Sequence, residues 1–92
     1  MHKLDKIIYQ IDDELEGAED YADASILYRD IDREISEQYA MMSNAELNHV
    51  NTLRLIGNKI VNESETAMKP VWDWNTEKVV QCVSKIKLKL KW

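Results

Sequence analysis

Residues 4–28 read LDKIIYQIDDELEGAEDYADASILY, and the spacing of apolar and polar side chains in this stretch decides the fold. One stripe of residues follows alternating three- and four-residue intervals: Leu4, Ile7, Ile11, Glu14, Ala18, Tyr21, Ser25 and Tyr28. The average interval of about 3.5 residues is the repeat of a helix that packs against other helices. About half of the positions outside the stripe are charged. The pattern predicts one long helix over about residues 3–29, with one side in a helical bundle.

A second stripe with the same spacing predicts a second long helix, over about residues 32–62. Its members are Ile35, Tyr39, Met42, Glu46, His49, Leu53, Ile56 and Ile60. Asp30 and Asp32 lie between the two stripes and are candidate N-caps, because a short acceptor side chain can bind the free N–H groups of a first helical turn. Since no long loop fits between the helices, we expect an antiparallel hairpin.

A third stripe predicts an amphipathic helix over about residues 71–91, after a polar connection. Its members are Trp72, Thr76, Val79, Val83, Ile86 and Leu90. Pro70 suits the first turn of this helix, because a proline has no N–H that would need a partner there. With only two glycines and one proline in 92 residues, the chain has little material for β-turns. We therefore predict a single all-α domain spanning residues 1–92.

Charge and composition exclude several classes of function. The formal net charge is −5 and the sequence pI is about 4.9, so no nucleic-acid partner is expected. No apolar run approaches the ~20 residues of a membrane span, so no membrane partner is expected. The lone Cys82 fits a reducing compartment, and the first residues do not form a secretory signal. These features together predict a cytoplasmic protein.

Three polar residues occupy positions where a helical bundle normally places apolar side chains: Glu14, Glu46 and His49. Glu14 lies about 16 residues, or ~24 Å of helix, before the turn, and Glu46 lies about 14 residues, or ~21 Å, after it. In an antiparallel hairpin the two carboxylates therefore come to nearly the same height. His49 follows Glu46 by three residues and shares its side of the helix. We expect the three side chains to meet in one layer of the core.

A Glu on one helix and a Glu-x-x-His on its neighbour form half of a carboxylate-bridged two-metal centre. Two copies of the chain supply four carboxylates and two imidazoles, so the ligand count closes if two hairpins dimerise into a four-helix bundle. Mixed oxygen and nitrogen ligands favour iron, or manganese, over a closed zinc site. The alternative is a non-catalytic helical interaction module, in which Glu14, Glu46 and His49 form a buried polar layer that fixes the register of a dimer.

The segments ELEGAEDYA (residues 14–22) and ELNH (residues 46–49) resemble the ferritin-like superfamily. A Glu, a small residue three positions later, a Tyr seven positions later and a downstream Glu-x-x-His resemble the pattern of bacterioferritins and rubrerythrins. In length and local sequence the chain is most similar to the encapsulin-associated ferritin-like proteins, which are half-ferritins. The resemblance covers about residues 4–60. It implies a ferritin-like hairpin with an extra helix, a homodimer or higher oligomer, and a ferroxidase that oxidises Fe(II) at an intersubunit di-iron centre.

The resemblance also implies roles for individual residues. Glu14, Glu46 and His49 match the iron ligands, and Tyr21 matches an aromatic residue beside the centre. Asp13 and Glu16 match acidic residues that guide metal ions inward. The alternatives are ordinary packing for Tyr21, and plain solvated charge for Asp13 and Glu16.

The chain departs from the family pattern at two places. Asn48 stands where a second acid is common within the Glu-x-x-His stretch, which removes a candidate entry residue but no ligand. Residues 87–92, KLKLKW, do not resemble an encapsulin-targeting peptide. An encapsulin shell is therefore not an expected partner.

Overall fold

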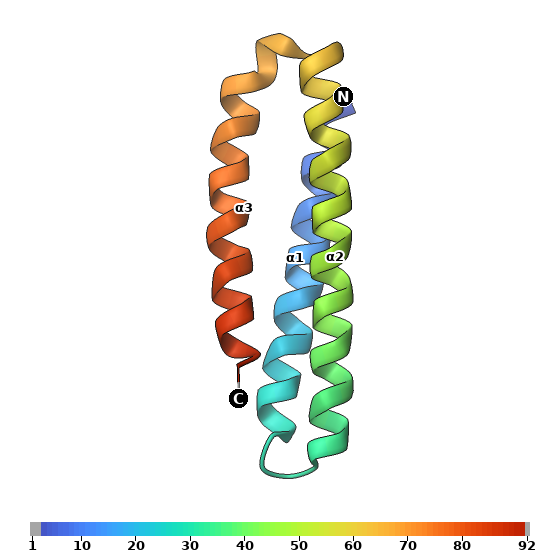
Figure 1. Ribbon diagram of the computed structural model, residues 1–92, viewed down its shortest axis with the longest axis vertical. Coiled ribbons are helices and arrows are strands. Elements are labelled where there is room, and N and C mark those ends of the chain that lie inside the picture. Colours follow the sequence, from blue (N-terminus) through green and yellow to red (C-terminus); the bar gives the residue numbers. More distant parts are fainter. Residues whose placement is uncertain (1–2, 92) are drawn as a thin grey trace.

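A computed structural model describes residues 3–91, which form three long helices and one short 3-10 helix (Figure 1). The elements are α1 (Lys3–Tyr28), α2 (Arg33–Glu63), η1 (Thr66–Met68) and α3 (Lys69–Lys89). No strand occurs within residues 3–91, so the all-α prediction is confirmed. Trp92, the last residue of the KLKLKW segment, lies outside the described residues. Among the described helices, none combines the length and apolar character needed to cross a membrane.

The ends of the helices follow the local sequence. The Asp32 side chain caps α2 by accepting a hydrogen bond of 3.2 Å from the backbone N–H of Ile35. Pro70 lies in the first turn of α3. This helix begins and ends about two residues before the predicted bounds of 71 and 91. α2 continues to Glu63, and Gly57 lies inside it.

The helices α1 and α2 lie antiparallel along a rod-shaped molecule of 50 × 17 × 17 Å (Figure 1). α3 packs on one side of this hairpin and contacts both helices. At its first turns the Trp72 indole N–H donates a hydrogen bond of 2.7 Å to Asn58. At its other end the Arg29 guanidinium donates to the carbonyl of Lys89 over 2.9 Å. α3 is therefore attached at both ends of the rod.

The core lies where the three helices meet. Its buried apolar members are Leu4, Ile7, Ile11, Leu15, Ala18, Ala22, Leu47, Val50, Val61, Trp72, Val79 and Ile86. Three small polar residues, Ser25, Ser36 and Ser43, are also buried. Their hydroxyls donate to backbone carbonyls of the facing helix: Ser25 to Ser36 over 2.8 Å, Ser36 to Ser25 over 2.6 Å, and Ser43 to Ala18 over 2.7 Å. These bonds hold α1 and α2 close together.

The core of α2 differs from the one predicted. Its buried residues include Ser36, Ser43, Val50 and Gly57, each one position after a member of the predicted stripe. The predicted members Ile35, Met42 and Ile56 are 39%, 42% and 43% exposed, so they do not belong to the core that one chain forms. The physical reason is α3, because it packs on only one side of the hairpin. We call the uncovered side, marked by Ile35, Met42, His49 and Ile56, the open face.

Candidate metal centre

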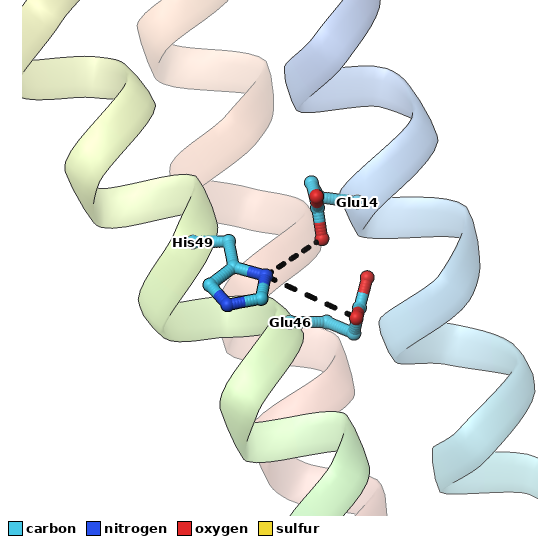
Figure 2. Close-up of side chains that lie close together, drawn as sticks. All are labelled: Glu14, Glu46 and His49. Carbon is cyan, nitrogen blue, oxygen red and sulfur yellow. Dashed lines mark hydrogen bonds and ion pairs between the residues drawn. The ribbon is translucent and has the colours of Figure 1, made fainter.

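Glu14 of α1 and the pair Glu46 and His49 of α2 point toward one another between the two helices (Figure 2). One candidate ligand atom from each side chain lies within 4.8 Å of the other two. His49 Nδ1 is 3.2 Å from Glu14 Oε2 and 4.0 Å from Glu46 Oε1. The structure thus brings together the three residues that the sequence placed at one height.

The cluster lies on the open face, at the edge of the core. The side chains of Glu14 and Glu46 are 29% and 25% exposed, and that of His49 is 59% exposed. α3 passes behind the two helices that carry these side chains (Figure 2). Within one chain the cluster is therefore partly exposed, because nothing within residues 3–91 covers this side of the hairpin, and its place in the core of a dimer stays a prediction. Because this side is uncovered, a ligand or a second protein chain can reach the three side chains.

The two carboxyl groups titrate as a pair. Hydrogen bonding between Glu14 and Glu46 lowers the pKa of Glu14, with a further contribution from the hydrogen bond to His49. The same carboxyl–carboxyl hydrogen bond raises the pKa of Glu46, and partial burial and the charge of Glu14 add to the effect. Opposite shifts of this kind are expected when two adjacent carboxyl groups share one proton. A cation placed between them would offset the repulsion that disfavours ionisation of the second carboxyl group.

A hollow of about 440 Å³ adjoins the cluster on the same side of the hairpin. Its lining residues are Gln10, Asp13, Glu14, His49, Thr52 and Leu53. Asp13, one of the two residues matched to a metal entry role, therefore lies beside the cluster. Glu16 does not line the hollow, because a residue two positions after Glu14 points ~200° further around the helix. Gln10 and Thr52 add neutral oxygen atoms that the sequence alone did not single out.

Tyr21 does not share the height of the cluster. It lies seven residues after Glu14, which is ~10 Å along the helix axis. Its ring stacks on Tyr39 of α2, with centroids 6.2 Å apart, and Tyr39 stacks in turn on Tyr28 at 5.9 Å. The structure therefore shows ring packing for Tyr21, whereas its role beside a metal stays a prediction. The stacking was detectable in principle, because all three tyrosines belong to the two predicted stripes.

The donor set suits a divalent cation. Two carboxylates and one imidazole supply three ligands and two units of negative charge. Iron and manganese take more than three ligands, so further ligands would have to come from another source. Among residues 3–91 the cluster supplies three of the six protein ligands of a two-metal centre. No known protein family, curated protein or solved structure matches the chain.

Proposed function

We propose that the chain binds metal as a ferritin-like protein, with Glu14, Glu46 and His49 as half of a di-iron centre shared by two copies. The observation that carries the proposal is the convergence of their ligand atoms within 4.8 Å, on the side of the hairpin that no other element covers. Three ligands from each chain make the six that a carboxylate-bridged two-metal site requires. Manganese is the alternative metal, because the same ligands suit it.

The open face supports a homodimer as the setting of this centre. Ile35, Met42 and Ile56 are each about two-fifths exposed and share their helical stripe with His49. Covering them with the same surface of a second copy would bury apolar area from both chains. It would also bury four carboxylates, which is costly without compensating charge. Two divalent cations bring four positive charges, so dimerisation and metal binding favour each other.

The activity that follows is oxidation of Fe(II), the substrate, by O₂ or peroxide. Each Fe(II) would give up one electron, and two of them with two protons from water would reduce O₂ to hydrogen peroxide, or hydrogen peroxide to two water molecules. Within the chain, Glu14 and Glu46 supply negative charge that stabilises the Fe(III) product, and His49 supplies the nitrogen ligand. Asp13, at the adjoining hollow, is the candidate residue for metal entry. A cytoplasmic location is part of the proposal, because a lone cysteine, Cys82, fits a reducing compartment.

The experiment that tests the proposal is iron content after anaerobic loading with Fe(II) and desalting. We expect about one iron per chain, two per dimer, followed by O₂-dependent oxidation. Glu14→Ala and His49→Ala should each abolish tight iron binding. Glu16→Ala is the matched control, because it removes an acidic side chain of the same helix that does not line the hollow, and it should at most slow uptake. Normal iron retention by Glu14→Ala would show that the site is assigned wrongly.

One observation favours a second candidate function, a non-catalytic helical interaction module. His49 already lies 3.2 Å from Glu14, so the three side chains satisfy one another in part without a cation. As a polar layer, they would fix the register of a dimer. The two functions differ in the response to metal, since a ligand that binds only the folded state raises stability. If the three side chains form a metal centre, Fe(II) or Mn(II) should strongly raise the unfolding temperature of the protein. If they form a polar layer, the unfolding temperature should hardly change.

A further inference from the structure

The carboxylate of Glu46 lies directly against Gly17 of α1. A Cβ atom at Gly17 would lie 3.0 Å from Glu46 Oε2, 3.6 Å from its Cδ and 3.8 Å from its Cγ. The first of these distances is tighter than ordinary packing, so even a methyl group would force the carboxylate to move. Glu46 Oε1 is on the side of His49, at 4.0 Å. The glycine therefore lies against the oxygen of Glu46 that is not directed at His49.

The spacing of α1 and α2 at this height is fixed by a buried hydrogen bond. The Ser43 hydroxyl of α2 donates to the carbonyl of Ala18, the residue after Gly17, over 2.7 Å. Ser43 and Ala18 are both fully buried. Because this bond holds the backbones together one turn from Glu46, the helices cannot easily separate to accept a larger residue at position 17. The flexible end of Glu46 is the part that would give way.

From this geometry we infer that Gly17 is a positioning residue for the Glu14–Glu46–His49 cluster. Its missing side chain provides the space in which the Glu46 carboxylate lies within reach of both Glu14 and His49. Glycine is otherwise unfavourable at an interior helix position, where alanine is the better helix former. No turn or positive φ angle requires it, since α1 is continuous there. The consequence for metal binding rests on the function proposed above.

The test combines Mn(II) affinity with the stability of the metal-free protein, for Gly17→Ala in the full chain. We expect Gly17→Ala to remain folded and to weaken Mn(II) binding by ~10- to 100-fold, the effect typical of residues that orient metal ligands. A glycine that served only the packing of α1 would leave Mn(II) affinity unchanged. An unchanged affinity would therefore overturn the inference as it concerns metal binding.

A double-mutant cycle with Glu46→Ala tests the contact itself without any metal. In the Glu46→Ala chain nothing opposes the helix-stabilising effect of alanine, so Gly17→Ala should raise the unfolding temperature by ~2–4 °C more than it does in the wild-type chain. Equal effects in the two backgrounds would show that Gly17 does not act on Glu46. If the wild-type chain bound no Mn(II) and no iron, the proposed function would fail, whereas this cycle would still decide the role of Gly17.

Discussion

At the scale of single residues, Glu46 connects the two helices of the cluster. Its carboxylate lies against Gly17 of α1, interacts with the carboxyl group of Glu14 and is 4.0 Å from His49. The raised pKa of Glu46 means that its ionised form is disfavoured in the folded protein. The stability that Glu46 contributes is therefore complete below the pKa of an unfolded glutamate, and is lost as the pH rises through the raised value. Glu14, with a lowered pKa, behaves in the opposite way.

Glu46→Gln should accordingly stabilise the metal-free protein at about pH 7. The amide keeps the shape of the side chain and removes the like charge next to Glu14. Because both carboxyl groups are partly solvated, we expect only about 0.5 kcal/mol, the size of a charge pair on a helix surface. The difference in unfolding temperature should shrink toward zero at about pH 4, where the wild-type side chain is protonated. A larger benefit at the lower pH would contradict the shared-proton description of the pair.

The sequence predicted the cluster because its evidence was local to each helix. Glu14, Glu46 and His49 interrupt regular stripes, and a constant rise per residue is enough to place them at one height. The same periodicity puts Tyr21 on the stripe of Glu14 but ~10 Å further along the helix, and it could not supply a role beside a metal, which only the family resemblance implies. Nor could it assign Gly17 a function. The effect of that residue depends on the distance between two backbones, which only the packed structure sets.

At the scale of elements, the seven-residue pattern of α2 contains two neighbouring stripes, and the sequence does not say which one is buried. Val50 and His49 are adjacent, yet Val50 is fully buried whereas the side chain of His49 is 59% exposed. The choice depends on α3, which is distant in sequence and packs on only one side of the hairpin. The existence of the helices could thus be predicted from local spacing, whereas the side that forms the core could not.

The attachment of α3 gives a prediction at this scale. A Cβ added to Gly57 would collide with the ring of Trp72, which is buried and hydrogen-bonded to Asn58. Unlike the carboxylate next to Gly17, this bulky ring cannot move aside. We expect Gly57→Ala to lower the free energy of unfolding by about 1–3 kcal/mol, despite the better helix propensity of alanine. Chemical denaturation measures the change, and increased stability of Gly57→Ala would disprove the close packing of Trp72 on α2.

At the scale of the whole molecule, the chain has two unlike sides. One side of the hairpin is covered by α3, which is attached through Trp72 and Arg29. The other side, the open face, combines exposed apolar residues with the Glu14–Glu46–His49 cluster. A second copy of the chain placed on the open face would account both for the exposed apolar residues and for the cluster. We propose that two chains together complete one metal site on this face.

The most direct test of this claim is the mass of the metal-loaded protein, measured by native mass spectrometry after addition of Mn(II) or anaerobic Fe(II). The account predicts a dimer that carries two metal ions. Ile56→Glu, on the open face, should weaken the dimer by at least ~10-fold and reduce metal binding with it. Leu55→Glu is the matched control, because Leu55 is 70% exposed, lies outside that stripe and should leave the dimer intact. A monomer that holds one metal ion, or a dimer that holds none, would contradict the account.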